Sequence, residues 1–139
     1  PRSPNDARFH LQYCLAHAWR GANVIEPDHS IDFATYLEDP RIRAAMAHVE
    51  VVDDASLTHY QQSRISVLNQ KGDRIDQLSV DSPRGSPESP LSTQEVIYKF
   101  TRLATPVLGD ERAQRLAGQV MDAGFHLPVR EWLADTTLI

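Results

Sequence analysis

Apolar residues recur at helical spacing near the start of the chain. At about 100° per residue, the segment from about Asp6 to Arg20 carries two apolar stripes on nearly opposite sides of one helix. Because both sides are apolar, the pattern predicts a helix that is buried on more than one side and that ends at Gly21. The first stripe holds Phe9, Tyr13, Ala16 and Arg20, and the second holds Leu11, Leu15 and Ala18.

The spacing changes to short β-prone runs before residue 80. A short helix is predicted at residues 30–37, and Asp39-Pro40 marks the start of another that runs to Ala47, because a carboxylate followed by proline suits a first helical turn. Gly72 supplies the positive φ that a hairpin turn needs. Three short strands are predicted, at residues 49–52, 64–69 and 75–80.

Residues 81–90 contain three prolines, three serines and one glycine, which predicts an irregular loop at a domain boundary. Ser92 and Glu95 then form a capping box in front of an apolar periodic segment. Its apolar positions are Val96, Phe100, Leu103 and Val107, and Pro106 is expected to bend or end this helix. Two more helices are predicted, at residues 110–123, closed by Gly124, and at residues 128–134.

These elements predict an α+β fold with two parts. Residues 1–90 form an α+β domain in which a small antiparallel sheet is packed by helices. Residues 91–139 form a C-terminal helical segment.

Composition and charge exclude several classes of protein. The 139 residues carry a net charge of -5, with no basic run that would mark a nucleic-acid-binding surface. No apolar stretch approaches the roughly 18 residues that a membrane helix needs. Cys14 is the one cysteine, so an internal disulfide is impossible and a reducing, cytoplasmic location is expected. Arginine greatly outnumbers lysine, which suggests a GC-rich bacterial genome.

His10, Cys14 and His17 follow one another at i, i+4 and i+7, and their side chains are of the types that bind zinc. A fourth ligand is not apparent nearby, and three ligands on one helix rarely converge on one ion. A packed thiol and two hydrogen-bonded histidines are the simpler interpretation. We expect no bound metal, and a small metal-binding protein stays as an alternative.

Tyr13 and Arg84 are the candidate site residues. Tyr13 lies near His10 and His17 on the helical wheel, and a hydroxyl beside imidazoles can donate or relay a proton in a cleft. The simpler interpretation makes Tyr13 part of the apolar stripe. Arg84 stands in the proline-rich loop, where a guanidinium can pair with a carboxylate. A solvated loop arginine is the default for this position.

Three segments resemble the C-terminal part of the MmgE/PrpD family. The segment 6–16 with Gly21 behind it is similar to the start of the family's lid-domain helix, and residues 83–92 resemble its proline- and glycine-rich boundary followed by Pro-Leu-Ser. The closing helices from Glu95 to Leu133 fit as well. His10 departs from the family's pattern, which more often has a small hydroxyl residue there.

The resemblance implies part of an enzyme. Family members have an all-helical domain and an α+β lid, with the active site in the cleft between them. By this resemblance residues 1–90 would correspond to most of the lid. They dehydrate 2-methylcitrate, decarboxylate cis-aconitate or epimerise iminodisuccinate, typically without an organic cofactor. By this resemblance Tyr13 matches the tyrosine of the lid helix and would donate a proton or bind a substrate carboxylate.

The family's histidines and lysine of the helical domain have no counterpart in these residues. The chain alone is therefore expected to be inactive, because a proton donor without its opposing base cannot hold a substrate in reactive geometry. The intact protein would bind a small polycarboxylate and form a homo-oligomer. A non-catalytic binding or dimerisation module that shares the lid fold is the other alternative.

Overall fold

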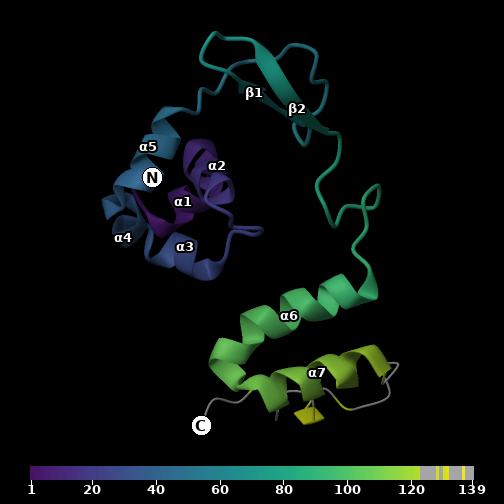
Figure 1. Cartoon of the computed structure of the whole chain (residues 1–139). Coiled ribbons are helices and arrows are strands. Elements are labelled where there is room, and N and C mark those ends of the chain that lie inside the picture. Colours follow the sequence, from purple (N-terminus) through teal and green to yellow (C-terminus); the bar gives the residue numbers. More distant parts are fainter. Residues whose placement is uncertain (123–127, 129, 132–135, 137–139) are drawn as a thin grey trace. The chain divides into compact units, whose positions relative to one another are not determined.

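The computed structural model describes residues 1–122, 128, 130–131 and 136. The chain divides into two compact units, unit 1 (residues 1–56) and unit 2 (residues 57–139). Helices predominate in the described part, and its two strands pair antiparallel (Figure 1). The predicted α+β class is confirmed, and a domain boundary near residue 90 stays a prediction.

Unit 1 consists of five short helices around a small core. Helix α2 packs against α5, and α1 contacts α3. The buried core residues are Ala7, Tyr13, Ala16 and Ile42, with Phe33, Tyr36, Leu37, Ala45 and Met46 packed against them. The helices are α1 (Pro4–Phe9), α2 (Leu11–Trp19), α3 (Pro27–Ile31), α4 (Phe33–Glu38) and α5 (Pro40–Ala47).

The first predicted helix is two helices, and the break lies at His10. This residue has φ -80° and ψ 96°, outside the helical region, and it caps α2 by accepting the Tyr13 N–H on Nδ1 at 3.4 Å. The side chain replaces a backbone partner that the first turn of a helix lacks. The helix predicted at residues 30–37 is likewise divided into α3 and α4, which meet at Asp32.

Only one of the two apolar stripes on α2 is buried. Tyr13 and Ala16 of the first stripe have no exposed area. In the second stripe Leu11 is 56% exposed, Ala18 is exposed and Leu15 is half-buried. The expectation that both sides are covered is therefore wrong for the described part of unit 1, because the core that contains Ile42 of α5 includes Tyr13 and Ala16 and not the second stripe.

The start of α5 confirms its sequence signal. The Asp39 carboxylate accepts the Arg41 N–H at 2.8 Å, and Pro40 occupies the first turn, where its missing N–H costs nothing. The segment after α5 differs from prediction, because residues 49–52 form no strand. In the described part they have no neighbouring strand with which to hydrogen-bond.

Unit 2 begins with the predicted hairpin. Strands β1 (Ser63–Leu68) and β2 (Arg74–Val80) pair antiparallel, with Ile65 opposite Leu78 and a register irregularity between Val67 and Leu68. Gly72 has φ +86°, and its N–H bonds to the Asn69 carbonyl at 3.0 Å. The hairpin is confirmed, and most of its residues are exposed to solvent.

Helices α6 (Thr93–Leu108) and α7 (Asp110–Asp122) lie side by side (Figure 1). The capping box at Ser92 and Glu95 is confirmed, with N–H donations in both directions. Pro106 does not end α6, which continues to Leu108 and stops at Gly109, with φ +82°. A proline lacks only its own backbone N–H, so the other hydrogen bonds of the last turn can still form.

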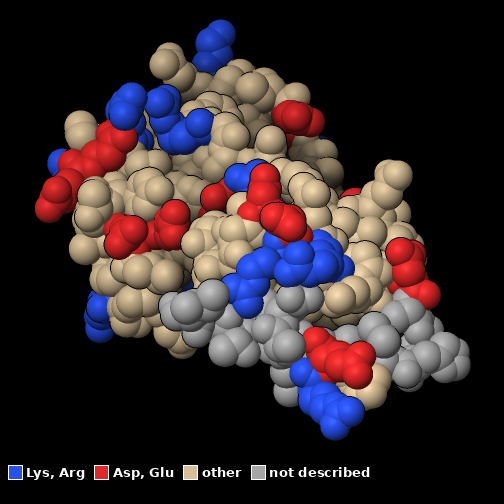
Figure 2. All heavy atoms as spheres, turned by 90° about the horizontal axis from the view of Figure 1, so that it is seen from below, with Lys and Arg blue, Asp and Glu red and all other residues tan. Residues whose placement is uncertain are grey.

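Two features predicted near the C-terminus, Gly124 and most of the helix at residues 128–134, lie outside the described residues. No helix in the described ranges is long and apolar enough to span a membrane. Figure 2 shows acidic and basic side chains interspersed over one face, in keeping with the modest net charge of -5.

Candidate functional site

Tyr13 lies on the buried side of α2. It has no exposed area, and its hydroxyl donates a hydrogen bond of 2.6 Å to the backbone carbonyl of His29, in α3. Burial raises the pKa of Tyr13 to about 12, with smaller contributions from the neighbouring Tyr36 and Cys14. The phenol is therefore neutral at physiological pH and acts as a hydrogen-bond donor. In this arrangement its proton is already engaged by a backbone acceptor.

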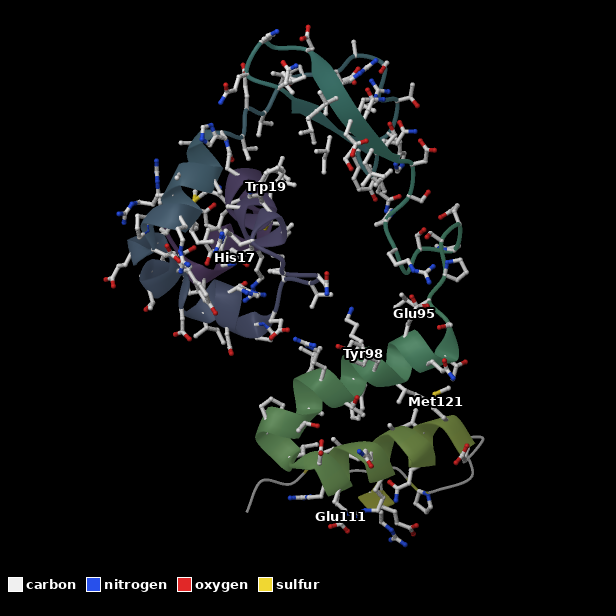
Figure 3. All side chains as sticks on the ribbon, viewed as in Figure 1. His17, Trp19, Glu95, Tyr98, Glu111 and Met121 are labelled. Atoms are coloured by element: carbon white, nitrogen blue, oxygen red, sulfur yellow. The ribbon has the colours of Figure 1, made fainter. Side chains whose placement is uncertain are left out.

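Three other rings complete a cluster with Tyr13. The centroid of the His17 ring lies 4.5 Å from Tyr13, 4.3 Å from His29 and 4.9 Å from Tyr36. His29 and Tyr36 are themselves 5.2 Å apart. We call these four residues the ring cluster. It joins α2, α3 and α4, and Figure 3 shows His17 among the helices of unit 1.

His17 is the electrostatically unusual member of the ring cluster. Its residue is 4% exposed, and the buried Nε2 atom has no hydrogen-bond partner among the described residues. Burial, with a smaller effect of His29, lowers the pKa of His17 below its ordinary value of 6.5. The imidazole is thus held neutral in a place where a charge would be poorly solvated.

Arg84 is engaged within unit 2. One guanidinium nitrogen donates to both carboxylate oxygens of Glu95, at 2.7 and 2.6 Å, and another donates to the Pro90 carbonyl at 2.5 Å. Hydrogen bonds from Arg84 and Ser92 lower the pKa of Glu95 to about 2. Arg84 therefore ties the proline-rich loop to the first turn of α6. A substrate carboxylate would have to compete with Glu95 for it.

The two predicted site residues lie in different units, Tyr13 in unit 1 and Arg84 in unit 2. Their roles toward a substrate stay predictions. Each already has a partner within its own unit, the His29 carbonyl for Tyr13 and the Glu95 carboxylate for Arg84.

The metal alternative finds no support in the geometry. No group of three or more His, Cys, Asp or Glu side chains within the described part of the chain is placed to hold a metal ion. His10 caps α2, the Cys14 thiol donates to the Ala7 carbonyl at 3.5 Å, and His17 lies in the ring cluster. Burial raises the pKa of Cys14, which favours the protonated thiol over the metal-binding thiolate.

Sequence spacing missed two members of the ring cluster. His29 and Tyr36 belong to α3 and α4, and no helical period relates them to Tyr13 or His17. The one local signal was the position of His29 in the first turn of α3, where its Nδ1 accepts the Glu26 N–H at 2.9 Å. That signal identifies a cap but no neighbour on α2.

Comparison with known proteins identifies a family. The family model described as the MmgE/PrpD C-terminal domain matches residues 1–123, which is most of the chain. No curated protein and no solved structure matches.

Proposed function

The chain belongs to the MmgE/PrpD family by its C-terminal domain, and from this premise we propose that it is the lid portion of a cofactor-independent lyase or isomerase. The substrates would be small di- or tricarboxylates, which are dehydrated, decarboxylated or epimerised beside a carboxylate. The observation that carries the proposal is the family match over residues 1–123. The single free thiol Cys14 and the preference for arginine support a cytoplasmic, bacterial setting.

The charge states of two residues in the ring cluster support the proposal that this chain holds only part of an active site. Reactions beside carboxylates need cationic groups that bind the substrate and a base that accepts a proton. His17 and Tyr13 are both neutral at physiological pH, because the pKa of His17 is lowered and that of Tyr13 is raised. These two residues can therefore supply a hydrogen-bond donor and a neutral imidazole, while the cationic groups that bind the substrate must come from elsewhere. We expect the chain alone to be inactive.

Tyr13 is the residue to which the proposal gives proton donation or carboxylate binding. A hydroxyl without exposed area cannot reach a substrate while it donates to the His29 carbonyl. The proposed role consequently requires α3 to move away from α2 during the catalytic cycle. Lid segments that move to complete a site are common in enzymes.

The exposed apolar face of α6 supports the proposal that the C-terminal helical segment packs against a partner. Val96, Phe100, Leu103 and Val107 are spaced by 4, 3 and 4 residues, and each is at least 39% exposed. This is the spacing of a seam between helices. The proposal assigns the face to the helical domain of the family or to a second copy of the chain. It equally suits the alternative function, a non-catalytic binding or dimerisation module.

One comparison separates the two functions. The coding sequence ahead of Pro1 is read, and the polypeptide that it encodes is purified together with this chain and assayed with 2-methylcitrate, cis-aconitate and iminodisuccinate. The lid proposal expects an upstream helical domain and turnover of at least one substrate, with none by the 139-residue chain alone. A gene that begins near Pro1, or a longer protein that converts none of the three, would support the non-catalytic module.

A matched pair of variants then tests Tyr13 in the longer protein. Loss of a general acid slows catalysis by roughly 10²–10⁴-fold, so Tyr13→Phe should lower kcat by that factor. Tyr60→Phe, at a position 88% exposed, is the control and should retain activity. A Tyr13→Phe protein with unchanged kcat would remove Tyr13 from the site.

A further inference from the structure

Helix α3 covers the Tyr13 hydroxyl and contacts α1 and α4 in addition to α2. It has five residues, which is too short for a helix to be stable without packing. Two contacts of His29 attach α3 to α2: its carbonyl accepts the Tyr13 hydroxyl at 2.6 Å, and its ring lies 4.3 Å from that of His17. The same residue caps α3 by accepting the Glu26 N–H on Nδ1. His29 is therefore the residue that attaches α3 to α2.

His17 is the residue of α2 that the His29 ring contacts. It is 4% exposed, and its Nε2 atom is enclosed without a hydrogen-bond partner among the described residues. The titratable rings that contact it are Tyr13 on its own helix, His29 on α3 and Tyr36 on α4. None of these side chains is a carboxylate, so none can pair with a positive charge on the imidazole.

The charged groups on the helices around His17 are engaged elsewhere or face solvent. On α5, Arg41 pairs with Asp39, and Arg43 donates to the Leu37 carbonyl. The Asp6 carboxylate of α1 accepts the Arg2 N–H, and the Glu26 side chain accepts the backbone N–H of His29. The remaining carboxylates of α3 and α4 and their boundary are exposed: Asp28, Asp32 and Glu38.

We propose that α3 is an acid-released cover over the Tyr13 hydroxyl, and that protonation of His17 is its trigger. A proton on the buried imidazole creates a cation next to the His29 ring and without an anionic partner. The charge is far better solvated in water than in the ring cluster, so the rings of His17 and His29 separate. Once they have separated, the attachment of α3 to α2 is reduced to the hydrogen bond of the Tyr13 hydroxyl, and α3 is left with its contacts to α1 and α4.

The direction of the pH effect follows from proton linkage. Burial and His29 lower the pKa of His17 in the closed form below 6.5, so the closed form binds fewer protons than the open form. The stabilisation of the closed form is therefore present above about pH 6.5 and is lost as the pH falls through the lower value. Each unit of pKa difference increases the opening equilibrium by about tenfold at low pH.

Opening has a defined consequence for Tyr13. Once α3 leaves, the hydroxyl no longer has its carbonyl acceptor and becomes available to another hydrogen-bond partner. That this partner is a substrate carboxylate rests on the proposed function. The cover itself rests only on the contacts within unit 1 and is tested without any activity measurement.

Hydrogen exchange of the whole chain provides the test. Protection factors for residues 26–38, corrected for intrinsic exchange, are compared at about pH 7.5 and about pH 5. The wild-type chain should lose protection in this segment at about pH 5, and α7 should serve as an internal reference with little change. His17→Phe keeps an aromatic ring without a titrating nitrogen and should show equal protection at both pH values.

Two further proteins make the result decisive. His48→Gln removes an exposed histidine of unit 1 and should respond to pH as the wild type does. If His17→Phe does not fold, His17→Gln replaces it, and a titration of the His17 ring by NMR in the wild type measures its pKa directly. A pKa at or above 6.5, unchanged protection in the wild type, or an equal decrease in the His17 variant would overturn the proposal.

Discussion

Replacing Tyr13 by phenylalanine removes one oxygen atom from the core of unit 1 and leaves the ring in place. The interaction that disappears is the hydrogen bond of 2.6 Å from the hydroxyl to the His29 carbonyl. A typical hydrogen bond contributes about 1 kcal/mol net, and an acceptor left unsatisfied adds about 1–3 kcal/mol. Since Tyr13 has no exposed area, water cannot simply take the place of the hydroxyl. We expect a decrease of about 2 kcal/mol in the free energy of unfolding of unit 1.

Thermal unfolding of the full chain measures this decrease. Each kcal/mol changes Tm by roughly 4–8 °C in a small domain, so the transition that contains α2 should fall by roughly 10 °C. Hydrogen exchange of α2 identifies that transition. Tyr60→Phe is the control, because its side chain is 88% exposed and its hydroxyl can be replaced by water.

An unchanged Tm would refute the reasoning. Surface substitutions usually alter stability by less than about 0.5 kcal/mol. If Tyr13→Phe falls within that range, the hydroxyl does not contribute the bond to His29 that the structure shows, and α3 is not held to α2 in the way described.

Three further predictions concern other parts of the chain. The pKa of Glu95 is lowered from 4.5 to about 2 by Arg84 and Ser92, so its stabilising effect is present above about pH 4.5 and lost toward pH 2. Glu95→Gln should therefore lower the hydrogen-exchange protection of α6 at neutral pH and not near pH 2; equal protection at neutral pH would contradict this. Gly109 has φ +82° and ψ 157° with open space around it, so Gly109→Ala should cost about 1–3 kcal/mol through backbone strain, measured by urea unfolding against Gly118→Ala as the helical control. Burial raises the pKa of Cys14, so iodoacetamide should alkylate it more slowly than a free cysteine at the same pH, and an equal rate would refute the burial.

Local signals in the sequence determined where several elements begin and turn. Asp39-Pro40 starts α5, Ser92 and Glu95 start α6, and Gly72 lies in the hairpin turn, all as predicted. In each case the residues that interact are within a few positions of one another, so the free energy that favours the element is set by a short segment. The same reasoning failed at residues 49–52, because a strand needs a partner that local sequence does not specify.

Helix α2 shows the limit of a periodic pattern. Its two apolar stripes were both visible in the sequence, but only packing decided that Tyr13 and Ala16 would be buried while Leu11 and Ala18 stayed exposed. A hydrophobic period predicts that a helix face is favourable to bury, but it does not specify which element will pack against that face.

The candidate site belongs almost wholly to the tertiary structure. The sequence by itself pointed to Tyr13 and placed it close to His17 on one helix. Only the folding of α3 and α4 against α2 brought His29 and Tyr36 to this pair. Their ring centroids lie 4.3 and 4.9 Å from that of His17 and 5.2 Å from each other. Helix capping and turns depend on bonds between near neighbours, whereas the pKa of His17 depends on burial by segments that no spacing relates to it.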